Sequence, residues 1–173
     1  MSTLAEMGTD TGLYKVVLLL HILTAIVGFG GVILNGVYAA EGKKRPGPGG
    51  MAIAEANFAV SVKWAEKFIY AVPVFGIMLV VMSDGAWAWG DTWIWTSLVL
   101  YVVALGLSHG ILIPGARRIN GLLGEMGQAG PPTGGPPPQV AQIEALGKRQ
   151  GITSMVLDAA LIVMLALMIW RPM

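Results

Sequence analysis

Cysteine is absent from the 173 residues of the chain, and charged residues make up only 12%. Without thiols the chain has no disulfide, no thiolate metal site, no cysteine-ligated iron–sulfur cluster and no cysteine nucleophile. A soluble domain carries about 25% charged residues, so the shortage of charge predicts a membrane protein, as do 55% apolar residues and a mean hydropathy of +0.68. The net charge of +1 also argues against nucleic acid as a partner.

Lysine and arginine are missing from residues 1–10 as well, where a signal peptide would need a basic region. We therefore expect the first apolar run to be retained as a membrane span. A bilayer core needs roughly 20 apolar helical residues, and four segments meet or nearly meet this length, at 13–39, 67–84, 93–114 and 152–170. Lipid cannot hydrogen-bond an open backbone. We predict an all-α polytopic membrane protein, a single-domain four-transmembrane-helix bundle of two helical hairpins.

Basic residues cluster in the two long segments between these spans, 40–66 and 115–151. By the positive-inside rule both segments are cytoplasmic loops and both chain ends lie outside. Each segment holds a Pro/Gly run, at 45–50 and 130–138, which we expect to be non-helical. Frequent alanine, glycine and proline, with little lysine and asparagine, indicate a GC-rich bacterial genome. The expected location is the bacterial plasma membrane.

Four tryptophans lie close together between the second and third spans: Trp87, Trp89, Trp93 and Trp95. Two interpretations are open, a stacking platform for a ligand and the aromatic belt that lines a membrane–water interface. We favour the belt, because the turn between two neighbouring spans lies at the membrane surface.

Small and polar residues recur in the first span at spacings of three and four, which places them on one helix face: His21, Thr24, Gly28, Gly31 and Asn35. Such a face is typical of close helix–helix packing in membranes. In the third span Gly106 and Gly110 form a GxxxG pair of the same kind. We expect both sets to be helix-packing surfaces.

Ionisable groups inside a bilayer are costly and mark candidate sites, which here are His21, His109 and Asp158. Haem held between the two histidines is one hypothesis. Counted at about 1.5 Å per residue, His21 lies roughly 10 Å and His109 roughly 20 Å below the outer edge of the membrane. This difference in depth disfavours a shared haem, while a haem held by one histidine and another ligand stays open. No metal site is predicted.

Asp158 matches the depth of His109, with Asn35 in the same layer. We predict a hydrogen bond or ion pair between His109 and Asp158, with Asn35 nearby. Such a polar cluster serves either a proton relay or packing, and packing is favoured. On the outer side His21 is level with Tyr101, a plausible hydrogen-bond partner.

The stretch LYKVVLLLHILTAIVGFGG, residues 13–31, has a tyrosine, a histidine seven residues later and then a glycine pair. It resembles the first helix of an uncharacterised bacterial family of four-helix integral membrane proteins. It is more distantly similar to CopD-type copper-handling proteins and to HemJ-type protoporphyrinogen oxidases, and the latter resemblance implies haem binding at His21. The Pro-rich loops and small size are also similar in style to accessory subunits of actinobacterial respiratory supercomplexes.

Three functions follow as hypotheses. The leading one is a non-catalytic accessory or assembly subunit that packs against other membrane protein subunits, for example those of a respiratory oxidase supercomplex. The first alternative is a haem- or metal-handling membrane protein that uses His21 or His109. The second alternative is a small transporter or proton relay that uses His109 and Asp158.

Overall fold

The computed structural model describes residues 8–45, 47–129, 135 and 137–172. Throughout these ranges the chain is helical apart from turns, and no strand occurs in them. Four helical stretches are long and apolar enough to cross a membrane, which confirms the all-α, four-span prediction: Gly12–Lys44, Pro48–Met82, Thr92–Ala129 and Pro138–Trp170.

Local breaks divide three of these stretches into shorter elements. The elements are α1 (Gly12–Ile33), α2 (Asn35–Lys44), α3 (Pro48–Phe58), η1 (Ala59–Ala65), α4 (Glu66–Met82), α5 (Thr92–Leu107), η2 (Ser108–Leu112), α6 (Ile113–Ala129) and α7 (Pro138–Trp170). The segments η1 and η2 are π-helical. Only α7 runs its whole length as one α-helix.

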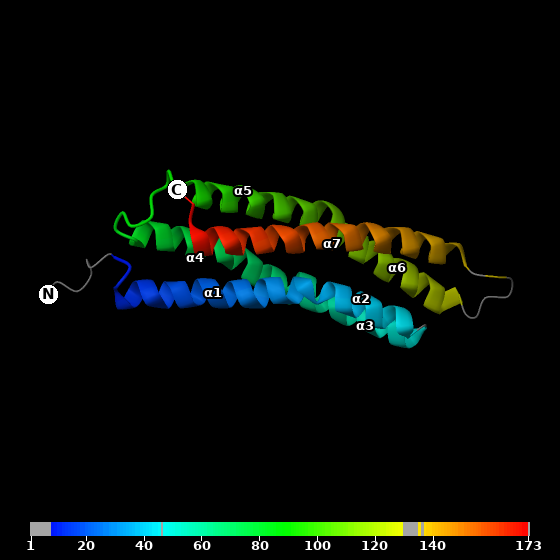
Figure 1. Cartoon of the computed structure of the whole chain (residues 1–173). Helices are drawn as coiled ribbons and strands as arrows, with labels where there is room; N and C mark the ends of the chain where they lie inside the picture. Colours follow the sequence, from blue (N-terminus) through cyan, green and yellow to red (C-terminus); the bar gives the residue numbers. More distant parts are fainter. Residues whose placement is uncertain (1–7, 46, 130–134, 136, 173) are drawn as a thin grey trace.

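The elements form two hairpins that lie side by side (Figure 1). In the first hairpin α1 packs against α4, and in the second α5 packs against α7. The hairpins also touch through α3 and α6. The start of α1 and the end of α7 lie at the same end of the molecule, called here the terminal end; the opposite end, where α2 and α6 end and α3 and α7 begin, is called the loop end (Figure 1).

The helices are longer than a bilayer requires. A 33-residue stretch such as Gly12–Lys44 extends roughly 50 Å, against about 30 Å for the hydrocarbon core. The segments 40–66 and 115–151, expected as loops, consist largely of helix. The loop end therefore projects beyond the thickness of a bilayer as a continuation of the spans.

The first Pro/Gly run, 45–50, differs from the prediction because its second half is helical. Pro48 opens α3, a position where its missing N–H has no helical partner to lose. Gly47 makes the turn with φ +74°. At Gly50 an added Cβ would lie 2.4 Å from the Arg45 carbonyl oxygen, so only glycine permits this close approach. Most of the second run, 130–138, lies outside the described residues.

At the terminal end the tryptophans divide into two kinds. The Trp87 indole N–H donates to the Tyr14 hydroxyl at 3.0 Å, and the ring meets Trp93 edge-on at 5.8 Å. The Arg171 guanidinium lies 4.1 Å from the centre of the Trp87 ring. Trp89 and Trp95 are about half exposed instead. Trp87 thus anchors the α4–α5 turn to the first helix and to the end of the last one.

Gly28 and Gly31 lie where α1 meets α4 and η1. An added Cβ at Gly28 would lie 2.9 Å from the Ile69 backbone nitrogen, and one at Gly31 would lie 2.6 Å from the Ala65 Cβ. Thr24 bonds within its own helix, donating to the Leu20 carbonyl at 2.8 Å. Close approach of the two backbones therefore depends on the glycines rather than on a bond from Thr24.

Gly106 and Gly110 have a different environment. A Cβ added at either position would meet no heavy atom of another described element within 4 Å. The GxxxG pair therefore does not pack inside the described part of the chain, because α5 and η2 turn this face away from their neighbours.

Candidate functional site between the two hairpins

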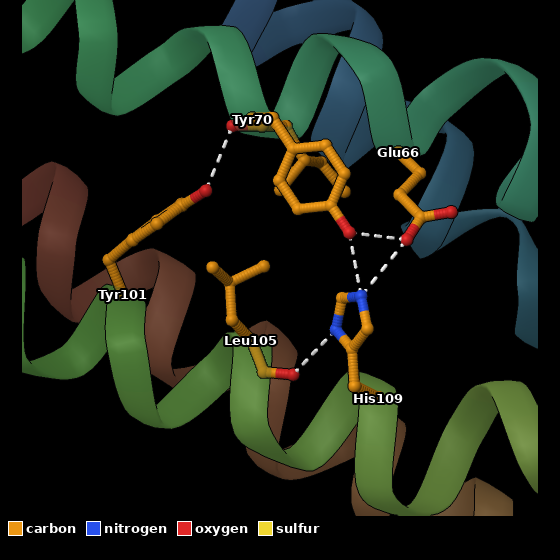
Figure 2. A network of polar contacts seen from close by, with 6 residues as sticks. Glu66, Tyr70, Tyr101, Leu105 and His109 are labelled. Atoms are coloured by element: carbon orange, nitrogen blue, oxygen red, sulfur yellow. Dashed lines mark hydrogen bonds and ion pairs between the residues drawn. The ribbon is translucent and has the colours of Figure 1, made fainter.

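Pro73 creates the first polar contact between the hairpins. Proline has no N–H, so the carbonyl four residues earlier, that of Ile69, loses its helical donor. The Tyr101 hydroxyl of α5 donates to this oxygen at 3.1 Å, a contact visible at the left of Figure 2. The carbonyl that Pro73 leaves free is thereby satisfied across the interface.

His21 forms its hydrogen bond with a residue other than the predicted partner, Tyr101. Its Nδ1 lies 2.9 Å from the Val72 carbonyl oxygen, and because a carbonyl only accepts, Nδ1 carries the proton. Gly76 makes room for the ring, since an added Cβ there would lie 3.2 Å from Cε1. His21 therefore joins α1 to α4 within the first hairpin, and Tyr101 is not its partner.

A cluster of three side chains, Glu66, Tyr70 and His109, joins α4 to η2 (Figure 2). The Tyr70 hydroxyl donates to Glu66 Oε1 at 2.5 Å and lies 2.6 Å from His109 Nε2. His109 Nε2 lies 3.0 Å from the same Glu66 oxygen. These three residues are called the triad below.

The hydrogen bonds of the triad require one exchangeable proton that Glu66 and His109 share. His109 Nδ1 is 3.0 Å from the Leu105 carbonyl oxygen, so Nδ1 donates. Nε2 and Glu66 Oε1 then need one proton between them, because two acceptors do not attract. Either Glu66 or His109 Nε2 carries this proton, and the Tyr70 hydroxyl contacts both atoms. The geometry can hold and pass one proton.

Both π-helical segments adjoin the triad. The segment η1 ends directly before Glu66, and η2 contains His109. A π-turn rotates the residues that follow it and is frequent at functional sites. Glu66 and Tyr70 were not among the predicted site residues, because they lie at the boundary of the second span. Their spacing of four, which puts both on one helix face, was the available signal.

The depth of the triad follows from the helices around it. Gly31 meets Ala65, so Glu66 lies level with the loop-end part of α1. Lys67 stacks over Trp64 at 5.9 Å, and both side chains are exposed. Paired aromatic and basic residues of this kind are typical of the membrane–water interface. The triad therefore lies near the membrane boundary on the loop-end side.

A cavity of about 90 Å³ lies beside the triad, between the two hairpins. This volume corresponds to about three water molecules at roughly 30 Å³ each. Residues of all four long helical stretches line it. Most of the lining is apolar, and its polar side chains are Asn35, Asn57, Ser61, Glu66, Tyr101, Ser108, His109, Gln150 and Asp158.

The predicted polar cluster shares this cavity without direct contact. Ser61 donates to the Asn35 side-chain oxygen at 2.7 Å, and His109 binds Glu66 within the triad. Asp158 lines the cavity but forms no hydrogen bond or ion pair with another described residue. The predicted bond between His109 and Asp158 is therefore absent, because the imidazole turns toward α4 while Asp158 lies on α7.

A haem does not fit these residues. His21 lies at the α1–α4 contact and is not among the residues that line the cavity. His109 has both ring nitrogens in hydrogen bonds. At about 90 Å³ the cavity is also smaller than the roughly 300–1,000 Å³ of ordinary small-molecule pockets.

Comparisons with known proteins agree with this architecture. A family model described as predicted integral membrane protein (DUF2269) matches residues 15–172. Neither a curated protein nor a solved structure was found to match. The more distant resemblance to CopD-type and HemJ-type proteins gains no support here. Because the matched residues cover nearly the whole chain, the protein belongs to this family of predicted integral membrane proteins, DUF2269.

Proposed function

We propose that this protein handles protons in the membrane, with the triad passing them between the aqueous face at the loop end and the inter-hairpin cavity. The observation that carries the proposal is the position of His109 Nε2, within hydrogen-bond distance of both Glu66 Oε1 and the Tyr70 hydroxyl. Carboxylate, phenol and imidazole are the side chains that most often donate and accept protons in proteins. Ionisable groups at membrane depth are otherwise rare, because they are costly there.

The place of the triad near the membrane boundary, with neither His109 nor Glu66 enclosed by protein, supports the same proposal. The His109 side chain is 46% exposed and that of Glu66 is 23% exposed, and the triad lies near the membrane boundary. Basic residues flank it at the loop end, which under the positive-inside rule makes that end cytoplasmic. The protein would then exchange protons with the cytoplasm of a bacterium, across its plasma membrane.

Proteoliposomes test the relay. The purified protein is reconstituted with a pH-sensitive dye inside the vesicles, and proton uptake is recorded after an external pH step. We expect Glu66→Gln to slow uptake at least about tenfold, because the relay loses its carboxylate. Glu55→Gln is the matched control, an exposed carboxylate on the same long helical stretch, and it should leave uptake unchanged. Uptake no faster than in empty vesicles, or equal in both variants, would refute the proposal.

A second function, that of an accessory subunit, is favoured by the open face of α5. Gly106 and Gly110 have no neighbour within 4 Å in the described part of the chain, while Val102 and Val103 beside them are more than half exposed. Small residues on a lipid-facing helix allow a helix of another protein to approach closely. A respiratory oxidase complex in the plasma membrane is the partner we propose under this function.

Native gels of detergent-solubilised membranes test this second function. We expect the protein to migrate with oxidase activity, and Gly106→Leu with Gly110→Leu to abolish this comigration. Gly30→Leu is the control, since Gly30 on α1 is equally free of neighbours. Migration of the native chain apart from oxidase activity would exclude the respiratory role.

A further inference from the structure

Asp158 is the charged group of the cavity that the triad leaves without a partner. Its side chain lines the cavity from α7 and makes no hydrogen bond or ion pair within the described part of the chain. An ionised carboxylate away from bulk water is costly unless a positive charge accompanies it. No lysine or arginine lines the cavity, and its one basic side chain, His109, is bound to Glu66. A carboxyl group in this place either binds a proton or is balanced by a cation from outside the chain.

The cavity wall limits what kind of cation this is. A metal ion needs several ligands arranged around it, and within the described ranges no three His, Asp or Glu side chains are placed to hold one. Phe29, Phe58 and several aliphatic side chains form much of the wall. Aromatic side chains and one carboxylate without a partner suit an ammonium group that carries carbon. The volume of about 90 Å³ leaves room for only a few carbon atoms.

We propose that the inter-hairpin cavity binds a small alkylammonium ion whose charge is balanced by Asp158. The inference rests on the proposed proton-handling function, because an amine bound beside the triad would exchange with the proton that Glu66 and His109 share. In this exchange the bond of the proton to Glu66 or His109 breaks and a bond to a water molecule forms, while the ammonium ion keeps its own N–H bonds. The cavity would then be the substrate site of a small proton-coupled carrier.

Calorimetric titration tests the site on the full-length protein in mild detergent, with methylammonium chloride as the probe. We expect saturable binding that weakens at least about tenfold in Asp158→Asn, because the charge that pairs with the ammonium is lost. Glu144→Gln is the matched control, an exposed carboxylate on the same helix, and it should keep the native Kd. Absence of saturable binding, or equal Kd in native protein and Asp158→Asn, would overturn the proposal.

Further variants distinguish the loss of the binding site from a defect in folding. Asp158→Glu retains the charge and should bind methylammonium within a few-fold of the native protein. Ala104 lines the cavity, so Ala104→Phe should abolish binding while leaving Asp158 intact. Val103→Phe, at the neighbouring exposed position, should not. Equal binding by the two phenylalanine variants, or sodium binding as tight as methylammonium binding, would overturn the alkylammonium site.

Proton uptake measured without amine separates this inference from the proposed function. Asp158-dependent methylammonium binding without proton uptake would refute the proton relay but support the amine site. Proton uptake that depends on Glu66, with no methylammonium binding, would refute the amine site but support the proton relay.

Discussion

Single polar groups hold the two hairpins in register, and the Tyr101 hydroxyl is the clearest case. It donates to the Ile69 carbonyl, which lacks a helical donor because residue 73 is proline. We predict that Tyr101→Phe lowers the free energy of unfolding in detergent by about 1–3 kcal/mol, because the carbonyl is left unsatisfied.

A double-mutant cycle isolates that contact. Pro73→Ala restores an N–H to the helix, so Tyr101→Phe should cost less in the Pro73→Ala background than in the native chain. The difference reports the coupling between the two residues. The same cost in both backgrounds would mean that Tyr101 stabilises the protein only by packing.

Packing between elements is closest where α1 meets η1 and α4. The Cβ of an alanine at position 31 would lie 2.6 Å from the Ala65 Cβ, whereas Gly30, one residue earlier, has no neighbour within 4 Å. We predict that Gly31→Ala destabilises the protein by about 1–3 kcal/mol through overpacking. Thermal unfolding in detergent measures the change.

Gly30→Ala serves as the adjacent comparison. It should leave stability unchanged or raise it by about 0.5–1 kcal/mol, because alanine has the higher helix propensity. Equal losses at both positions would contradict the close contact of α1 with the Ala65 backbone region.

The whole molecule presents two unlike ends to the two sides of a membrane, and the absence of cysteine makes their orientation easy to measure. Ala40→Cys labels the loop end and Ala88→Cys the terminal end, both at exposed positions. We predict that a membrane-impermeant maleimide applied to intact cells modifies Ala88→Cys alone, because the positive-inside rule predicts a cytoplasmic loop end. In permeabilised cells the maleimide should modify both variants. Labelling of Ala40→Cys in intact cells would show that the orientation is the opposite of the predicted one.

The triad shows where prediction from sequence stops. The depth count placed His109 on the inner side of the third span, but its partner was assigned to Asp158 by depth alone. Depth along a helix follows from counting residues, whereas the direction of a side chain depends on helix rotation. Here the π-helical segment η2 includes His109 itself, and no periodicity in the sequence predicts this segment.

The sequence by itself determined the class of the protein, the four spans and their pairing into hairpins. Those properties depend on hydropathy and length, which add up along the chain without reference to distant residues. Only the tertiary structure decided that Glu66 and Tyr70 meet His109, that Asp158 remains unpaired in a shared cavity, and that Gly106 and Gly110 face away from the bundle. Each of these outcomes depends on how one helix is rotated against another, and rotation is set by contacts between residues far apart in the sequence.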